Sequence, residues 1–202
     1  DEAEKYSAAA FATKHEDAIY FSKRVTRAVP DGGPIEAHTD LVKKLDYECE
    51  LAVVLGRDAR DVPAGQTRDY IFGYTVLNDV SARDVQTAHK QWYFGKSLDG
   101  FTPIGPCIVT ADTFADYPPR LGIRSFVNGE KRQDSNTALQ IFDIDHVVAE
   151  LSQGMTLKAG TIIATGTPAG VGMGMDPPQF LKPGDVVRCE IEGIGTLTNP
   201  VK

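Results

Sequence analysis

The chain has 202 residues, and its 21 basic and 28 acidic side chains give a formal net charge of −7. This acidic balance argues against nucleic-acid binding, which depends largely on Lys and Arg side chains that neutralise phosphates. Hydrophobic residues make up 42% of the chain, enough for a globular core, and no apolar run reaches the roughly 18 residues that a membrane span needs. The cysteines are widely spaced and the chain opens without a secretory pattern, so we expect a cytoplasmic protein with one main domain.

The first half of the chain predicts two strands and two helical stretches. Residues 1–17 are rich in Ala, Glu and Lys but lack an apolar face, which is typical of a solvated helix or a frayed terminus. The turn-forming residues of 28–40 predict a loop. Between Leu45 and Gly56, polar and apolar residues alternate, which predicts a half-buried strand. A more fully buried strand is predicted over 70–77, and it is followed by a helix that Ser81 is expected to cap.

The second half predicts mostly short strands. Asn128-Gly129 is a strong signal for a β-hairpin. Apolar residues at helical spacing predict a helix from Asp143 to Gln153, and Gly154 is expected to end it. The other predicted strands are Ile104–Thr110, Leu121–Val127, Glu130–Gln133, Thr161–Thr165 and Val186–Gly193, the last with a hairpin partner at Thr196–Thr198. Many short strands with few helices predict the α+β class with mostly antiparallel or mixed sheets.

Two acidic residues stand out on the first predicted strand. Glu48 and Glu50 are two positions apart, so their side chains share one strand face with Cβ atoms roughly 6.5–7 Å apart. Two like charges at this separation raise each other's pKa unless a cation lies between them. The pair is therefore either two exposed acids on a solvent face or part of a site for a hard cation such as Mg²⁺.

Asp79 extends this pattern. It follows a buried strand, where a charge without a partner is costly. Two roles fit the position, the N-cap of the next helix and a third oxygen ligand for a cation. Arg83 and Gln86 come next and share a helix face with the end of the strand. Three carboxylates beside an Arg and a Gln suit the binding of a metal-chelated organic anion.

Lys96 and a glycine-rich loop complete the set of candidate residues. Lys96 lies among aromatic residues, which fits either a cation–π contact or the stabilisation of a developing enolate. The loop GTPAGVGMG, residues 166–174, lacks the Lys-Ser/Thr ending of a phosphate-binding loop. A backbone segment that approaches another group closely is the better interpretation, and Thr167 within it offers a hydroxyl and an N–H to a carboxylate.

Taken in order, these motifs resemble the fumarylacetoacetate hydrolase family. The similarity begins near Tyr20 and rests on the segments LDYECELAVVLGRDA, FGYTVLNDVSARDVQ, KSLDGFTPIGPCIVT, VNGEKRQDSNT, IIATGTPAGVGMG and LKPGDVVRCEIEGIGTLTNPV. The resemblance implies a mixed β-roll or sandwich with a few flanking helices, usually as a homodimer. It also implies a division into an N-terminal lid segment and loop, residues 1–44, and a catalytic domain, residues 45–202.

The resemblance further implies a role for each candidate residue. Glu48, Glu50 and Asp79 match the positions that hold Mg²⁺ or Mn²⁺, with Ca²⁺ as a further option. The positions that match the substrate pocket are Arg83, Gln86, Lys96, Gly166 and Thr167, and Lys96 is also expected to be catalytic.

One feature of the family is not matched. Members carry a His and, three residues later, a Glu in a lid helix, and this pair activates water. His15 and Glu16 are adjacent instead. We therefore expect Glu2 to be the catalytic Glu of this pair, with its His lost upstream of a start that is cut short.

The activity expected from these residues is metal-dependent cleavage of a C–C bond in a small 2-oxo acid, either hydrolysis of an acylpyruvate or decarboxylation of an oxaloacetate-like acid. Two alternatives stay open. One is an isomerase, oxaloacetate tautomerase or sugar-acid dehydratase on the same scaffold, and the other is a catalytically silent protein that binds metal and oxo acid. We expect no nucleic-acid or membrane partner.

Overall fold

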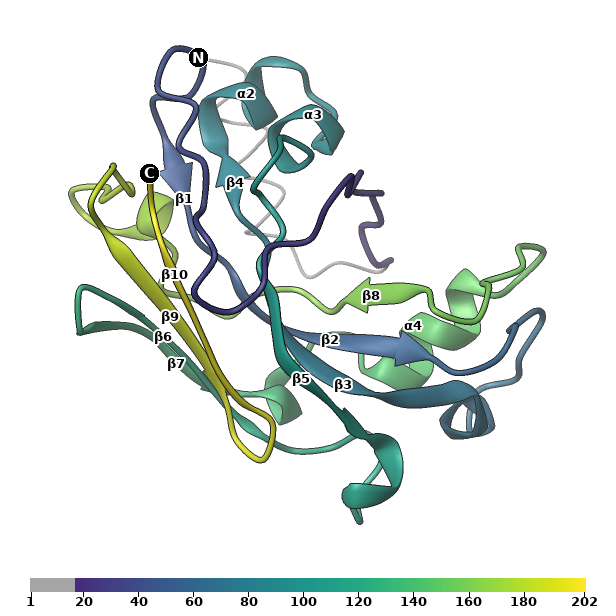
Figure 1. Cartoon of the computed structure of the whole chain (residues 1–202). Coiled ribbons are helices and arrows are strands. Elements are labelled where there is room, and N and C mark those ends of the chain that lie inside the picture. Colours follow the sequence, from purple (N-terminus) through teal and green to yellow (C-terminus); the bar gives the residue numbers. More distant parts are fainter. Residues whose placement is uncertain (1–16) are drawn as a thin grey trace.

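Two four-stranded sheets carry the fold, in the strand orders β5-β3-β2-β8 and β10-β9-β6-β7. A computed structural model describes residues 17–202 (Figure 1). Every hydrogen-bonded pair of neighbouring strands in these sheets is antiparallel. The strands are β2 (Cys49–Leu55), β3 (Ile71–Asn78), β5 (Ile104–Thr110), β6 (Gly122–Val127), β7 (Glu130–Asn136), β8 (Ile162–Ala164), β9 (Val186–Ile191) and β10 (Gly195–Pro200). The predicted α+β class is confirmed, with antiparallel ladders and few helices.

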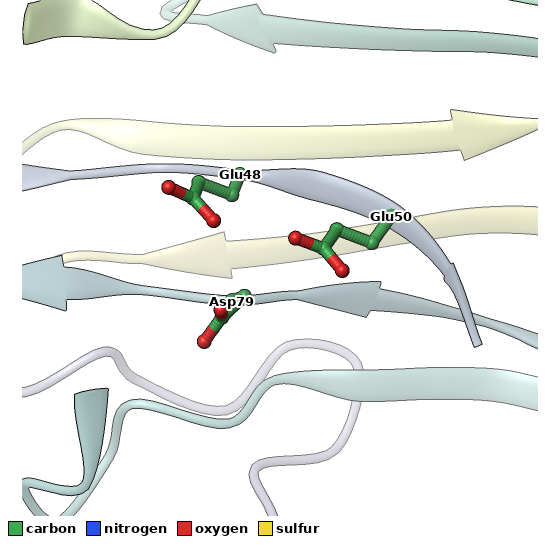
Figure 2. Close-up of side chains that lie close together, drawn as sticks. All are labelled: Glu48, Glu50 and Asp79. Atoms are coloured by element: carbon green, nitrogen blue, oxygen red, sulfur yellow. The ribbon is translucent and has the colours of Figure 1, made fainter. Parts of the chain in front are cut away.

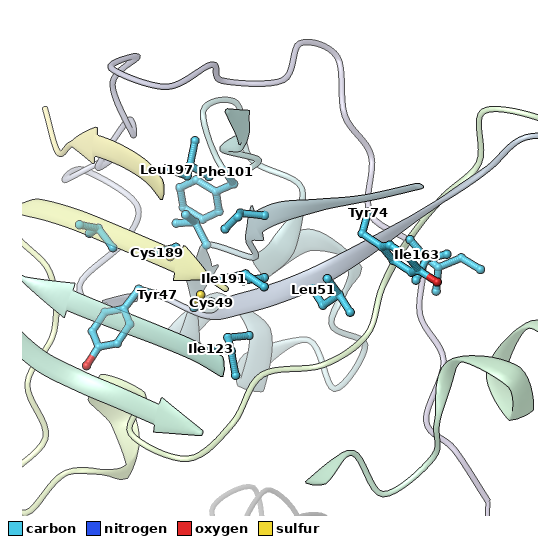
Figure 3. Close-up of a cluster of buried hydrophobic side chains, with 14 of the residues drawn as sticks. Tyr47, Cys49, Leu51, Tyr74, Phe101, Ile123, Ile163, Cys189, Ile191 and Leu197 are labelled. Carbon is cyan, nitrogen blue, oxygen red and sulfur yellow. The ribbon is translucent and has the colours of Figure 1, made fainter. Parts of the chain in front are cut away.

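The hydrophobic core lies between the two sheets (Figure 3). Leu51 of β2 is fully buried there, together with Ile123 of β6 and Ile191 of β9. Full burial of a Leu or Ile side chain stabilises a fold by about 1.5–3 kcal/mol. The apolar contacts therefore hold the two sheets face to face, and they fix the strands that carry the candidate site.

The helices are short and lie at the margins of the sheets (Figure 1). They are α2 (Arg83–Ala88), α3 (Tyr93–Lys96) and α4 (Ile144–Leu151), with 3₁₀ turns η1 (Thr67–Tyr70), η2 (Ala111–Thr113), η3 (Thr137–Leu139) and η4 (Gly172–Gly174). Between residues 17 and 202, no helix combines the length and the apolar character that crossing a bilayer would take.

The predicted hairpin at Asn128-Gly129 and the predicted helix within residues 143–153 are both confirmed. Asn128 and Gly129 adopt positive φ angles of 51° and 84°, the geometry of the tight turn that joins β6 to β7. Asp143 caps α4, because its carboxylate accepts a hydrogen bond of 2.8 Å from the backbone N–H of His146.

The prediction of one half-buried strand from Leu45 to Gly56 is wrong in two respects. The segment divides into β1 (Leu45–Asp46) and β2, and β1 pairs with the short strand β4 (Ser81–Ala82). Every residue of β2 is buried, since the strand lies between β3 and β8 and both of its faces are covered. Polar and apolar residues do alternate along the strand. One face lies among charged groups and the other lies in the hydrophobic core, and neither faces solvent.

The predicted capping role of Ser81 is also wrong. Ser81 lies in β4, and its hydroxyl donates to the backbone carbonyl of Asp79 at 2.8 Å. The helix α2 begins after Ala82 and has no side-chain cap. Residues 28–40 form a loop, as predicted, and Ile35 within it packs in the hydrophobic core. The domain boundary at residue 44 stays a prediction.

Candidate metal centre

Three carboxylates converge where β2 and β3 lie side by side (Figure 2). Glu48 directly precedes β2, Glu50 lies within it, and Asp79 directly follows β3. One oxygen from each residue lies within 4.8 Å of the others. Glu48, Glu50 and Asp79 are only 8%, 3% and 2% exposed. The pairing of the two strands sets this arrangement, because the register places Cys49 opposite Asn78, and the backbone N–H of Asp79 donates to the carbonyl of Glu48.

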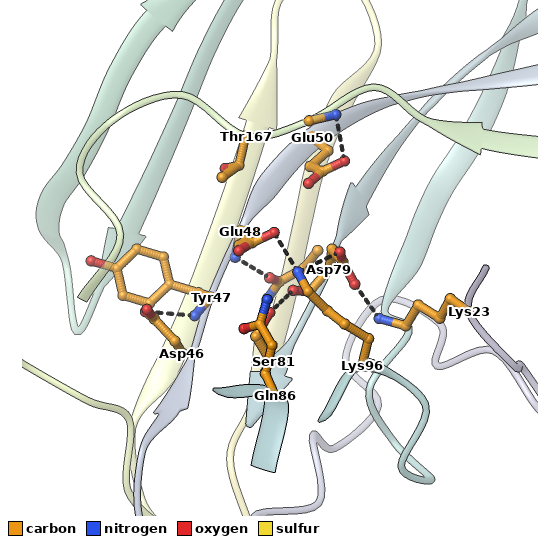
Figure 4. Close-up of polar contacts among 12 residues, drawn as sticks. Lys23, Asp46, Tyr47, Glu48, Glu50, Asp79, Ser81, Gln86, Lys96 and Thr167 are labelled. Atoms are coloured by element: carbon orange, nitrogen blue, oxygen red, sulfur yellow. Dashed lines mark hydrogen bonds and ion pairs between the residues drawn. The ribbon is translucent and has the colours of Figure 1, made fainter. Parts of the chain in front are cut away.

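Two lysines reach this cluster from different parts of the chain (Figure 4). The ammonium of Lys96 lies between Glu48 and Asp79, 2.7 Å from an oxygen of each. Lys23 contacts the other oxygen of Asp79 at 2.5 Å, and it also donates to the backbone carbonyl of Phe101. Lys23 is not among the residues predicted from the sequence, because no local pattern distinguishes it from other lysines, although its side chain is only 14% exposed.

Arg83 forms the third positive group. Its Nε lies 2.9 Å from Asp46 and its Nη1 lies 2.5 Å from Glu48, and Nη1 also donates to the side-chain oxygen of Gln86 at 3.2 Å. Burial alone would lower the pKa of Arg83, but Glu48 and Asp46 outweigh burial and raise it. The guanidinium is therefore charged and held in one orientation by two carboxylates.

The pKa directions follow from this pairing. Burial would raise the pKa of Asp79, but Lys23 and Lys96 hold it below its ordinary value. Burial would lower the pKa of Lys96, but Glu48 and Asp79 hold it above its ordinary value. The ammonium of Lys96 therefore keeps its proton between these two carboxylates.

Glu50 differs from the other two acids. Within residues 17–202 it forms no ion pair, and its carboxylate accepts only the backbone N–H of Gly166, at 2.8 Å. Burial, followed by the charges of Asp79 and Glu48, raises the pKa of Glu50 well above its ordinary value. An ionised carboxylate in this position therefore calls for a further positive charge.

A hard divalent cation fits this donor set. Four buried carboxylates, from Asp46, Glu48, Glu50 and Asp79, face the three cations Lys23, Arg83 and Lys96. The carboxylates therefore outnumber the cations by one, and Glu50 is the carboxylate that no described cation pairs with. Carboxylate oxygens are the ligands that Mg²⁺ and Mn²⁺ prefer, and a cation here would relieve the repulsion among the three acids of the cluster.

A close approach of α3 to α2 brings Lys96 within reach of the carboxylates. A Cβ atom built on Gly95 would lie 2.6 Å from the backbone nitrogen of Gln86 and 2.7 Å from its Cα. Only glycine permits this contact, since real Cβ atoms do not approach backbone atoms so closely. The ammonium of Lys96 can then extend into the cluster from the next residue.

The glycine-rich loop runs beside the segment that carries the ligands. Gly166 donates its N–H to Glu50, and the hydroxyl of Thr167 donates to the carbonyl of Cys49 at 3.0 Å. Gln133 of β7 is fully buried and donates its amide to Thr167 Oγ1 at 2.7 Å. The predicted hydroxyl of Thr167 is therefore already hydrogen-bonded to the protein, and the loop supports the strand that carries Glu50.

The structure brings most of the predicted residues together. Glu48, Glu50, Asp79, Arg83, Gln86 and Lys96 form one buried cluster, with Gly166 and Thr167 behind Glu50. Glu2 lies outside the described residues, so its predicted role stays a prediction. Lys23 and Asp46 also belong to this site and were not predicted from the sequence, because their partners are distant in the sequence.

Comparisons with known proteins agree on the family and the fold of the chain. The family model of the C-terminal region of fumarylacetoacetate (FAA) hydrolase matches residues 1–202. A solved structure described as a fumarylacetoacetate hydrolase from psychrophilic Exiguobacterium antarcticum superimposes with a TM-score of 0.90 and 48% identity, over 95% of this chain and 68% of that chain. A 5-carboxymethyl-2-hydroxymuconate delta-isomerase from Mycobacterium smegmatis gives a TM-score of 0.82 and 42% identity, over 93% of this chain and 70% of that chain.

Among curated sequences, the oxaloacetate tautomerase YisK of Bacillus subtilis is 44% identical over 186 residues, which are 92% of this chain and 62% of that protein. An uncharacterised protein of Staphylococcus epidermidis is 46% identical over 183 residues. The chain spans 59–62% of the length of such curated relatives.

Proposed function

Because this chain belongs to the family of the fumarylacetoacetate hydrolase C-terminal region, we propose that it is a divalent-metal-dependent enzyme that interconverts the keto and enol forms of a small 2-oxo acid. The observation that carries the proposal is the buried triad of Glu48, Glu50 and Asp79 with a protonated Lys96 between two of its members. An oxaloacetate tautomerase among the relatives and a solved isomerase of the same fold support the reaction class.

The three carboxylates would hold Mg²⁺ or Mn²⁺, with Ca²⁺ as a further option. When bound, such a cation acts as a Lewis acid that polarises the oxygens of a 2-oxo acid and stabilises negative charge on them. The chain would supply the oxygen ligands in surroundings largely shielded from water, since all three residues are at most 8% exposed.

The chain's own cations then complement the substrate. Lys96 keeps its proton in contact with Glu48 and Asp79, so it adds a fixed positive charge beside the reacting group. Arg83 and Gln86 are hydrogen-bonded to each other and are the groups we assign to the substrate carboxylate. Gly166 and Thr167 fix the loop behind Glu50, which keeps that carboxylate in place.

Cleavage of a C–C bond is the second candidate function. A solved structure with 48% identity is described as a fumarylacetoacetate hydrolase, and hydrolysis passes through the same build-up of negative charge on the 2-oxo group. Hydrolysis also needs a base that activates water, whereas decarboxylation needs only stabilisation of that charge. Our candidate for the base is Glu2.

A substrate panel with Mg²⁺, repeated with EDTA, tests the proposal. The panel combines oxaloacetate, acetylpyruvate and fumarylpyruvate, and the readouts are enol absorbance and released pyruvate. Metal-dependent loss of enol without pyruvate is the expected result. Release of pyruvate from an acylpyruvate would establish the hydrolase instead, and release from oxaloacetate alone would establish a decarboxylase. No reaction, with Mg²⁺ and oxalate nevertheless bound, would leave a binding protein and overturn the enzymatic proposal.

A further inference from the structure

Asp46 has the most completely hydrogen-bonded carboxylate beside the metal centre, although it is not one of the three clustered acids. It is fully buried. One oxygen accepts the backbone N–H groups of Tyr47, at 2.9 Å, and Gly172, at 2.7 Å. The other accepts Nε of Arg83 at 2.9 Å and the backbone N–H of Met173 at 3.0 Å. A single side chain thus joins β1, α2 and the far end of the glycine-rich loop.

The loop is fitted to this carboxylate. A Cβ atom at Gly172 would lie 2.8 Å from Asp46 Oδ1 and 2.0 Å from the carbonyl oxygen of Gln179, so glycine is required there. Tyr47 adds a second anchor, since its hydroxyl donates to the carbonyl of Gly170 at 2.8 Å. The loop therefore lies against β1 over several residues, and its backbone N–H groups at 172 and 173 point at one charged acceptor.

Arg83 is held from both sides. Its Nε forms an ion pair with Asp46, and its Nη1 forms one with Glu48, which is one of the three clustered acids. The third nitrogen, Nη2, is buried and has no hydrogen-bond partner among residues 17–202. Since a guanidinium is planar, fixing two of its nitrogens also fixes the direction of the third. A carboxylate is the kind of acceptor that pairs best with such a donor.

We propose that Asp46 is a positioning residue that couples the glycine-rich loop to the orientation of Arg83, and so to the binding of an organic anion at the metal centre. The inference rests on the proposed function. Asp46 itself is not one of the three clustered acids, and we assign it no contact with the bound anion. It acts through Arg83 on one side and through the N–H groups of Gly172 and Met173 on the other.

The test measures binding of Mg²⁺ and then of oxalate by calorimetry, with melting temperatures alongside. Oxalate carries the adjacent carboxylate oxygens of a 2-oxo acid and is not turned over. We expect D46N to bind Mg²⁺ nearly as the unaltered chain does but to bind oxalate about 10- to 100-fold more weakly, the range typical of residues that orient metal-site groups.

D185N is the matched control. Asp185 is also buried, at 7% exposure, and its carboxylate accepts from the side-chain amide of Asn128 and the backbone N–H of Lys182. These contacts involve none of the clustered residues. D185N should therefore lower the melting temperature and leave oxalate affinity unchanged. If D46N behaves in the same way, Asp46 is merely structural and the inference is overturned.

A second measurement needs no variant, in case D46N does not fold. Coupling is reciprocal, so oxalate added to the Mg²⁺-loaded chain should slow hydrogen exchange at the amides of Gly172 and Met173. The amide of Asn128 serves as the reference. Unchanged exchange at 172 and 173 with oxalate bound would overturn the inference alone. Failure of the unaltered chain to bind oxalate with Mg²⁺ would overturn the proposed function and the inference together.

Discussion

Glu50 and Leu51 are neighbours on β2 and are 3% and 0% exposed, yet their side chains enter two different environments. Leu51 packs against the second sheet in the hydrophobic core, where burial is favourable whatever the protein binds. Glu50 lies on the opposite face among other acids, where burial is unfavourable until a cation arrives. The same degree of burial is therefore favourable on one face of the strand and unfavourable on the other. The apolar face stabilises the fold, whereas the acidic face is destabilising unless a cation binds there.

The variant E50Q should have the largest effect, because it changes the acidic face of β2 and leaves the apolar face intact. The amide cannot supply the anionic oxygen of a metal ligand, so metal-dependent turnover should fall by more than about 100-fold, beyond the range seen for groups that only orient ligands. The melting temperature in EDTA should stay the same or rise, because the amide stays uncharged at every pH, whereas ionisation of the buried Glu50 carboxyl is unfavourable without a cation. Enzyme assays and calorimetry on the same preparation check both effects.

E190Q is the matched control for that variant. Glu190 is a strand glutamate on β9, partly exposed and paired with Arg188. It should keep full activity. Full activity in E50Q as well would remove Glu50 from the proposed ligand set.

L51A probes the other face of the same strand. Truncation of a buried Leu leaves a cavity and typically costs about 2–5 kcal/mol of unfolding free energy. Denaturant unfolding should show this loss, while the Mg²⁺ affinity of the folded protein changes little. A large loss of Mg²⁺ affinity at a temperature where L51A is folded would show that the two faces are not separable.

The pH dependence of metal stabilisation sharpens the comparison further. The pKa of Glu50 is raised in the metal-free fold, so this fold loses stability as the pH rises from the ordinary pKa of a Glu towards the raised value. Mg²⁺ requires the ionised carboxylate. The stabilisation of the fold by Mg²⁺ should therefore grow with pH, towards about 2.7 kcal/mol of unfolding free energy at a Mg²⁺ concentration 100 times the Kd.

Scanning calorimetry with Mg²⁺ or EDTA across this pH range measures the effect. E50Q should show a flat profile, because its side chain at position 50 has no proton to release. A Mg²⁺ effect that is equal at all pH values in the unaltered chain would contradict the assignment of Glu50.

The smallest expected effect lies outside both environments. D143A removes the cap of α4 and should cost about 1 kcal/mol of stability. Neither Mg²⁺ affinity nor turnover should change, because the capped N–H belongs to His146 and not to the metal centre. Loss of activity without loss of stability would refute this separation.

Local chemistry accounts for the parts that were predictable. The turn at Asn128-Gly129 depends on two adjacent residues, and it was predicted from them. The cap at Asp143 is equally local, because it joins residues only three positions apart. The spacing of Glu48 and Glu50 likewise puts both on one strand face. The motifs that resemble the fumarylacetoacetate hydrolase family predicted the family that the whole-chain match shows.

Long-range contacts account for the parts that were not predictable. Lys23 reaches Asp79 across 56 positions, and Asp46 reaches Gly172 across 126. No periodicity or propensity encodes such partners. The break between β1 and β2 depends in the same way on β4, whose pairing with β1 competes with one continuous strand. Ser81 is drawn into that pairing and leaves the helix uncapped.

The tight contact at Gly95 has a consequence for how this centre could be altered or copied. A methyl group there would touch none of the carboxylates, yet it would collide with the backbone of Gln86 and displace α3. The displacement would pass directly to the ammonium of Lys96, which has two partners at 2.7 Å and little tolerance for movement. A mutational survey ranked by distance from the reacting atoms would overlook this position. Anyone who transplants the centre into another scaffold must carry the glycine along with the lysine.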